Sequence, residues 1–324
     1  MNELALAVFA SETGTHLVRP PTSARWSAHL RDFDVRSYEE RLAARGFRFA
    51  GRTSRTFPPL LRAIHDPPPG LFVRGGADLE LLSRPAVAIV GARACSGYGV
   101  AVARGLARDL AAAGLVVLSG LARGVDAEAH RGALAAGGVT VAVLGCGIDR
   151  DYPAVHAELA RRIRERGLVV SEYEPGAEPA PWRFPARNRI IAGLSAATAV
   201  VEARERSGAL ITADLALEEG RDVLAVPGEV TSSLSAGTNA LLKLGAAPCT
   251  SAQDVLDLFG LAVENRAAPT VGESAAAVLA ALPAAADDLV HATGLDAQTV
   301  AAALAELELA GLACEGDGVY RSGS

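Results

Sequence analysis

Short apolar, β-branched runs alternate with helix-like segments from residue 85 onward. Each run is apolar along its whole length, which is typical of a strand buried on both faces, whereas a half-exposed strand would alternate with polar residues. Such strands alternating with helices predict an α/β fold, an extended Rossmann-like doubly wound parallel sheet. The six expected strands cover residues 86–90, 115–119, 140–145, 168–172, 198–203 and 222–227.

Other regions flank this pattern. Residues 1–56 are predicted to be a poorly defined N-terminal extension, and a proline-rich segment then leads to a short edge strand at 71–75. We expect the α/β domain to span residues 57–260, followed by a linker at 261–271. Residues 272–324 show three helices and a hairpin turning at Gly316–Gly318, which predicts a small winged-helix domain.

Charge is unevenly distributed along the chain. The net charge of -6 argues against a globally basic nucleic-acid-binding protein, although a local patch stays open. The winged-helix region is acidic, and Gln298 is the only side chain of its third helix suited to reading bases. We therefore expect this domain to dock a protein partner or to be structural. Its charged residues are Glu273, Asp287, Asp288, Asp296, Glu306, Glu308, Glu315 and Asp317 against Arg321.

The four cysteines lie far apart, without the spacing of a zinc site or a disulfide framework, which suits a reducing compartment. No stretch reaches the roughly 18 apolar residues of a membrane span. We expect a cytoplasmic protein with no membrane association, no metal and no cofactor.

The loops that follow the strands hold the candidate chemistry, because ligands of an open parallel sheet bind beyond the carboxyl ends of its strands. The first loop has a glycine-rich turn with Gly91, Arg93 and Ser96 before a helix, which favours phosphate binding. Its spacing matches neither the dinucleotide fingerprint nor the Walker loop. A phosphate site is therefore expected, and a standard NAD or ATP site is not.

The second loop, SGLARGVDAEAH, contributes Ser119, Gly120 and Arg123. Asp126 and His130 are four residues apart and would share a helix face. They are either a catalytic pair or an N-cap aspartate with a surface histidine, and the lack of an adjacent nucleophile favours the second interpretation.

The segment FPARNRIIAGLS places Phe184, Arg187, Asn188 and Arg189 at the start of a helix. Arginine binds phosphate through two prongs, and an aromatic ring can stack a base. The alternative is that Phe184 lies in the core and that Arg189 pairs with a nearby glutamate such as Glu202.

Ser207 and Gly208 follow the fifth strand and provide another close backbone approach before a helix. Several loops at one edge, with glycines and arginines, indicate a groove for a polyanion better than a small-molecule pocket. No metal cluster and no Ser–His–Asp order emerges from them.

The runs VAIVGARACSGYG, LSGLARGVDAEAHRGAL, TVAVLGCGIDRDYP, VSEYEPG, FPARNRIIAGLS, VVEARERSGALITADLALEEGRDVLAVPG and GTNALLKLGAA resemble the DNA-processing protein A family, also called Smf. The resemblance covers about residues 57–250 and the winged-helix tail. It implies a non-enzymatic single-stranded DNA-binding protein of natural transformation, which protects incoming strands, loads the RecA recombinase and works as a homodimer. The single-stranded DNA contacts that we predict on this basis are Gly91, Arg93, Ser96, Ser119, Gly120, Arg123, Phe184, Arg187, Asn188, Arg189, Ser207, Gly208 and Lys243.

The resemblance also implies a dimer contact through Leu241, Leu242 and Leu244, with RecA binding nearby. Two features depart from the family pattern. Residues 1–56 show no clear equivalent of the family's helical N-terminal module, and Trp182 and Arg183 stand where a lysine is common before the FPxRN segment.

The residues alone leave two alternative functions. A Rossmann-like nucleoside-monophosphate hydrolase would have a PGGxGTxxE turn, where this chain has RSGALITADLALEE. The other is a regulatory nucleotide-binding module that signals through the acidic tail.

Overall fold

The computed structural model describes residues 2–262, 271–316 and 318–322. Most of the predicted linker at 261–271 and one residue of the predicted hairpin turn, at position 317, therefore lie outside the described residues. In the described part of the chain, no helix combines the length and the apolar character needed to cross a membrane.

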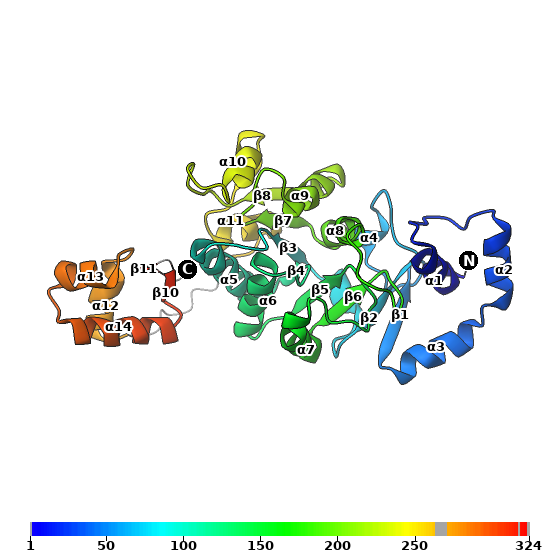
Figure 1. Ribbon diagram of the computed structural model, residues 1–324, viewed down its shortest axis with the longest axis horizontal. Helices are drawn as coiled ribbons and strands as arrows, with labels where there is room; N and C mark the ends of the chain where they lie inside the picture. The colour runs from blue at the N-terminus through cyan, green and yellow to red at the C-terminus, as the bar shows by residue number, and fades with distance from the viewer. Residues whose placement is uncertain (1, 263–270, 317, 323–324) are drawn as a thin grey trace.

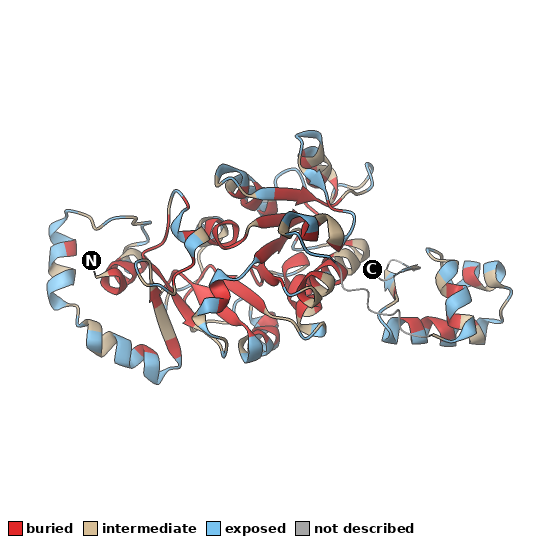
Figure 2. Cartoon of the chain, turned by 180° about the vertical axis from the view of Figure 1, so that it is seen from behind, coloured by how far each residue is buried: buried red, intermediate tan, exposed pale blue. Residues whose placement is uncertain are grey.

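A nine-stranded sheet forms the centre of the described structure, with the order β1-β2-β6-β5-β4-β3-β7-β8-β9 (Figure 1). The six predicted strands are confirmed, and they pair in parallel. They are β3 (Ala86–Val90), β4 (Val116–Ser119), β5 (Thr140–Leu144), β6 (Leu168–Ser171), β7 (Ala197–Val200) and β8 (Asp222–Ala225). Buried residues dominate these strands, as their continuous apolar runs predict (Figure 2).

Two antiparallel strands extend the sheet on one side. The expected edge strand is β2 (Gly70–Arg74), which pairs with β6. It is not the edge, because β1 (Phe47–Gly51) pairs with its free side. The short β9 (Ala247–Pro248) lies beside β8 at the opposite edge.

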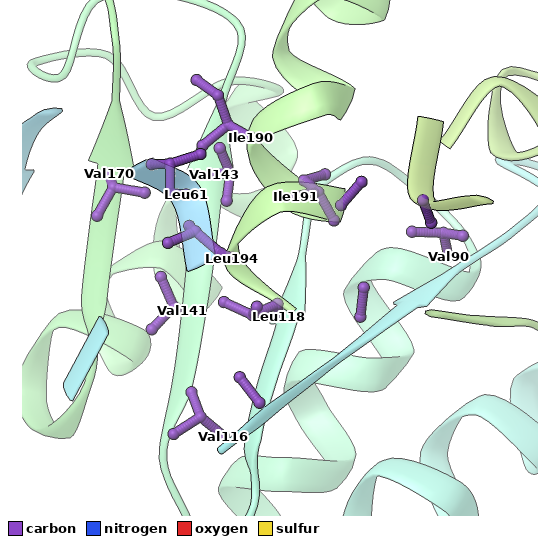
Figure 3. Packing of buried hydrophobic residues seen from close by; sticks show 14 of the residues in the cluster. Leu61, Val90, Val116, Leu118, Val141, Val143, Val170, Ile190, Ile191 and Leu194 are labelled. Atoms are coloured by element: carbon purple, nitrogen blue, oxygen red, sulfur yellow. The ribbon is translucent and has the colours of Figure 1, made fainter. Parts of the chain in front are cut away.

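Helices cover both faces of the sheet. On one face, Leu61, Ile190, Ile191 and Leu194 pack over the sheet valines (Figure 3). The helices of this face are α4 (Pro59–Arg62), α8 (Arg183–Leu194), α9 (Gly208–Glu218) and α10 (Ala236–Lys243). The helices of the other face are α1 (Glu3–Thr13), α5 (Gly97–Ala112), α6 (Val125–Ala135), α7 (Ala157–Arg166) and α11 (Ala252–Leu256).

The N-terminal region has more structure than the sequence indicated. It forms α1, α2 (Ala24–Asp32) and α3 (Val35–Ala44) before β1. Helix α1 is buried along most of its length, with Leu4 and Val8 in the core. A helix that is apolar on most sides has no polar face to reveal its period, so the hydrophobic pattern of α1 does not predict a helix.

The C-terminal domain has the three helices and the hairpin that the sequence predicts. These elements are α12 (Glu273–Ala280), α13 (Ala286–Thr293), α14 (Ala297–Leu309), β10 (Ala313–Gly316) and β11 (Val319–Ser322), the two strands being antiparallel. The domain has a core of its own, in which Val278, Leu289, Leu304 and Leu307 are fully buried or nearly so.

Candidate functional site

Two adjoining pockets open at the carboxyl ends of the central strands. The first, which we call the α9 pocket, has a volume of about 220 Å³. The second, which we call the Tyr152 pocket, has a volume of about 420 Å³. Arg93, Phe184 and Arg187 border both pockets. The loops after β3 and β4 and the start of α8 therefore meet in one place, as their position after parallel strands predicts.

Most of the predicted site residues line these pockets. They are Gly91, Arg93, Gly120, Arg123, Phe184, Arg187, Asn188, Ser207 and Gly208. The structure places Ser96, Ser119, Arg189 and Lys243 elsewhere.

Arg187 is buried beneath the pockets and is held by the protein itself. Its guanidinium donates hydrogen bonds to the carbonyl oxygens of Gly120, at 2.8 Å, and Val143. A Cβ atom at position 120 would lie 2.5 Å from Nη2 of Arg187, so this approach requires glycine. Burial lowers the pKa of Arg187, while the neighbouring carboxylate of Asp126 opposes that shift. Its location suits a group that fixes the ends of β4 and β5.

The loop between β4 and α6 is fixed at several points. The carboxylate of Asp126 accepts hydrogen bonds from the amides of Gly120, at 3.1 Å, and Ala122, at 3.3 Å. The carbonyl of Leu121, whose φ of 58° is unusual for a residue with a side chain, lies 3.0 Å from Nδ1 of His156. Arg123 is exposed in the same loop. A rigid loop therefore presents this arginine.

The interpretation of His130 as a surface residue is wrong. His130 is fully buried, and its Nδ1 lies 2.7 Å from Oγ1 of Thr140. Because that hydroxyl donates to the carbonyl of Val117, Nδ1 of His130 is the donor in this contact. Burial lowers the pKa of His130 to about 3. Asp126, in turn, holds the loop amides rather than pairing with this histidine.

An internal carboxylate occupies the start of α5. Glu202 is buried, and it accepts hydrogen bonds from the amide and the hydroxyl of Ser96, at 2.9 and 2.5 Å. A phosphate at this helix start would meet that negative charge. Ser96 therefore holds the turn in place, and the exposed Arg93 is its outward-facing member.

Arg189 pairs with acidic residues other than Glu202. It contacts Glu172 at 2.6 Å and Asp66 at 3.2 Å, and both Arg189 and Glu172 are buried. The alternative interpretation, an ion pair between Arg189 and a nearby glutamate, is therefore confirmed, with Glu172 in place of Glu202 as the glutamate. Burial would raise the pKa of Glu172, but Arg189 and His16 hold it below its ordinary value.

Ser119, Lys243 and the predicted dimer residues lie outside the pockets. The buried hydroxyl of Ser119 donates to the carbonyl of Ile89 at 2.7 Å and so ties β4 to β3. On α10, Leu241 packs in the core, whereas Lys243 and the following Leu244 are exposed. Leu241 therefore supports the fold, and its side chain is not free to form a dimer contact.

Phe184 contacts two other planar groups. The guanidinium carbon of Arg93 is 5.6 Å from its ring centroid. The ring of Tyr152 stacks on it with a centroid separation of 5.5 Å and an interplanar angle of 26°. A Cβ atom at Gly145 would lie 2.9 Å from the Phe184 ring, so the strand end below is also in close contact. Phe184 is consequently half-buried.

Tyr152 is a site residue that was not among the residues predicted from the sequence. Tyr152 is 43% exposed and lines the Tyr152 pocket. The signal was present, because this tyrosine belongs to the loop that follows β5 at the same edge of the sheet. We call Arg93, Arg123 and Tyr152 the rim of the site, and Asp126, His130 and Arg187 its floor.

Within the described part of the chain, neither Arg93 nor Arg123 forms an ion pair. Arg187, the other arginine of the pockets, faces inward and lies near Asp126. The rim therefore presents two uncompensated positive charges beside an aromatic pair.

Comparisons with known proteins identify the family of this chain. The model of the family "DNA recombination-mediator protein A" matches residues 48–260, and that of the "DprA winged helix domain" matches residues 263–318. The chain is 48% identical to the DNA processing protein DprA of Streptococcus pneumoniae over 63% of this chain and 71% of that protein. It is 44% identical to protein Smf of Escherichia coli over 64% of this chain and 56% of that one.

Two solved structures are also similar. DNA processing protein A from Streptococcus pneumoniae matches with a TM-score of 0.67 and 38% identity, covering 79% of this chain and 92% of that chain. DNA processing protein A from Helicobacter pylori, described for its single-stranded DNA binding mode, matches with a TM-score of 0.59 and 32% identity, covering 66% and 95%. Because the family model covers more than half of the sequence and the fold agrees, this chain belongs to the DNA recombination-mediator protein A family, also called DprA or Smf.

Proposed function

We propose that this protein binds single-stranded DNA at the two pockets. Arg93 and Arg123 contact phosphates of the strand. At the start of α9, Gly208 offers its backbone amide to a further phosphate, because helix N-termini favour anions. The amide of the neighbouring Ser207 already donates to the carbonyl of Arg204 at 3.1 Å. Asn188 lines the α9 pocket, and its side-chain amide donates to the carbonyl of Gly208 at 3.1 Å.

One observation supports this proposal most strongly: two exposed arginines, which have no acidic partner among the residues that the structure describes, stand beside a stacked aromatic pair. Proteins that bind single strands without sequence preference combine positive charge along the backbone with rings that stack the bases. A site for a small nucleotide would also need a polar set that reads one base, whereas the rim is open and positively charged. The solved relative from Helicobacter pylori, described as binding single-stranded DNA, has the same fold.

The buried residues have a supporting role in this proposal. The donors of Arg187 and Arg189 are directed at carbonyl oxygens and carboxylates inside the protein. Ser96 and Ser119 likewise hold neighbouring segments together. We assign these residues to positioning the loops, and the rim residues to contacting the strand.

We extend the proposal to the biological role that the family resemblance implies. The protein protects incoming single strands during natural transformation and loads the RecA recombinase onto them. It acts as a homodimer that forms through α10, where Leu242 is half-buried and Leu244 is 85% exposed. RecA then docks near this helix, and the acidic winged-helix domain binds a further protein.

The test is fluorescence anisotropy with a labelled dT oligonucleotide, with unlabelled AMP and duplex DNA as competitors. Arg93 and Arg84 provide a matched pair of variants, because these exposed arginines flank the two ends of β3. We expect Arg93→Ala to weaken binding about tenfold, as the loss of one charge-assisted hydrogen bond predicts, and Arg84→Ala to leave it unchanged. Competition by AMP, or its hydrolysis, with equal affinities for both variants would support the nucleotide-hydrolase alternative instead.

A further inference from the structure

The Tyr152 pocket has the features of a base-binding site. Its volume of about 420 Å³ lies within the range of small-molecule sites, roughly 300–1,000 Å³. Arg93 and Arg123 line it together with the rings of Tyr152 and Phe184. A pocket bordered by two cations and two rings matches one nucleotide unit, which has a negatively charged phosphate and a flat base.

Exposure distinguishes the two rings. Phe184 contacts Arg93, Tyr152 and the strand end at Gly145, and it is half-buried. Tyr152 stacks on Phe184 and is still 43% exposed. Tyr152 is therefore the more exposed residue of this stack.

The backbone on both sides of Tyr152 is firmly held. On one side, Asp151 forms an ion pair with Arg164 at 2.5 Å. On the other side, the buried His156 contacts the carbonyl of Leu121 at 3.0 Å and so joins this segment to the loop that holds Arg123. A stacking ring that is held in place before binding loses little conformational entropy when a base arrives.

We propose that Tyr152, rather than Phe184, is the platform on which a base of the bound single strand stacks, and that the Tyr152 pocket holds that nucleotide. Arg93 and Arg123 contact the phosphates next to it. Phe184 supports the tyrosine from below. This inference rests on the proposed single-stranded DNA binding and assigns one part of it.

Trp182 provides the matched control. It is also 43% exposed, but it does not line the Tyr152 pocket. Its ring contacts the rings of His16 and Tyr173 edge-on, with centroid separations of 6.1 and 6.2 Å. If exposed aromatic surface alone promoted binding, the loss of either ring would have the same effect. If the pocket is the site, only the loss of Tyr152 matters.

The experiment measures anisotropy of a labelled dT oligonucleotide and of an abasic strand with the same number of phosphates, for wild type, Tyr152→Ala, Tyr152→Phe and Trp182→Ala. Thermal unfolding of each variant confirms that it is folded. We expect Tyr152→Ala to weaken dT binding roughly 5- to 150-fold, the effect of losing one stacked base, while Tyr152→Phe and Trp182→Ala bind as wild type does. The salt slope of Tyr152→Ala should equal that of wild type, because no phosphate contact is lost.

The abasic strand separates stacking from charge. Wild type and Tyr152→Ala should bind it equally, since it has no base to stack. The inference is overturned if Tyr152→Ala binds dT like wild type, if Trp182→Ala is equally impaired, or if the abasic strand shows the same loss. The proposed function survives each of those results, provided that wild type binds the dT strand and Arg93→Ala weakens that binding. If wild type itself does not bind dT, the proposed function fails together with the inference.

Discussion

The rim and the floor of the site contain the same type of residue in opposite environments. Arg93 and Arg123 are exposed and lack acidic partners within the described residues, whereas Arg187 is 4% exposed and donates to two backbone carbonyls. An exposed cation contributes little to folding and is available to a ligand. A buried cation must be satisfied internally, and its removal leaves unpaired groups behind. Residue type alone therefore does not identify a DNA contact, and burial separates the two roles.

The largest difference between floor and rim should appear in stability. Arg187→Met leaves Asp126 and the carbonyl oxygens of Gly120 and Val143 buried without this cation, so we expect a loss of about 3–5 kcal/mol in the free energy of unfolding. Arg93→Ala should change it by less than about 0.5 kcal/mol. Urea unfolding of both variants measures this. If Arg187→Met were as stable as wild type and lost only DNA affinity, the assignment of Arg187 to the floor would be wrong.

The floor should also respond to acid. The pKa of His130 is lowered to about 3 by burial, with His156, Arg187 and Arg131 adding to the shift. The unfolded chain therefore binds a proton near pH 6.5 that the folded chain does not, so stability is full above pH 6.5 and falls as the pH drops toward 3. Between pH 6.5 and 5, protonation of His130 in the unfolded chain should lower the free energy of unfolding by about 2 kcal/mol.

The variant His130→Asn places an amide near Nδ1 and cannot titrate in this range. Its free energy of unfolding should therefore fall less steeply between pH 6.5 and 5 than that of wild type. A matched control is His291, which is exposed on α13; His291→Asn should retain the wild-type pH dependence. Parallel pH curves for wild type and His130→Asn would contradict a neutral, buried His130.

A rim variant should have the opposite profile. We expect Arg123→Ala to weaken single-stranded DNA binding about tenfold and to leave the urea midpoint unchanged, because this side chain is exposed at the tip of a rigid loop. Anisotropy and urea unfolding on the same preparation measure both effects. A fall in stability without a fall in affinity would place Arg123 with the floor.

The smallest effect should come from removing the winged-helix domain. The domain has its own core and a strongly acidic composition, so it offers little to a polyanion. A chain ending at residue 262 should bind dT oligonucleotides within about twofold of the full chain at moderate salt, where distant charges are screened. A loss of tenfold or more in anisotropy would show that the domain takes part in DNA binding.

The sequence predicted the central strands and the edge at which the site lies, because strands buried on both faces are continuously apolar and the following loops must meet. It did not predict α1, whose burial on most sides removes the amphipathic period. It also placed Arg187 and Arg189 with the exposed contacts. Their partners are backbone carbonyls and distant carboxylates, which no local spacing marks.

Tyr152 was missed for a related reason. The distance along the chain between Tyr152 and Phe184 hides a stack that only the folded chain forms. The tyrosine could be expected near the site from its place after β5, but its orientation depends on anchors such as Arg164 and His156. Sequence reasoning found the location of the site, and the division between contacting and supporting residues required the structure.

The most direct test of the rim as the DNA-contacting surface is the salt dependence of dT binding by the double variant Arg93→Ala/Arg123→Ala, with Arg84→Ala as control. Each phosphate contact to a single strand adds about 0.7 to the slope of log K against log salt. We predict a slope shallower than that of wild type by about 1.4 for the double variant, and an unchanged slope for Arg84→Ala. A double variant with the wild-type slope would show that the phosphates are bound elsewhere, and the division into rim and floor would not describe how this protein holds DNA.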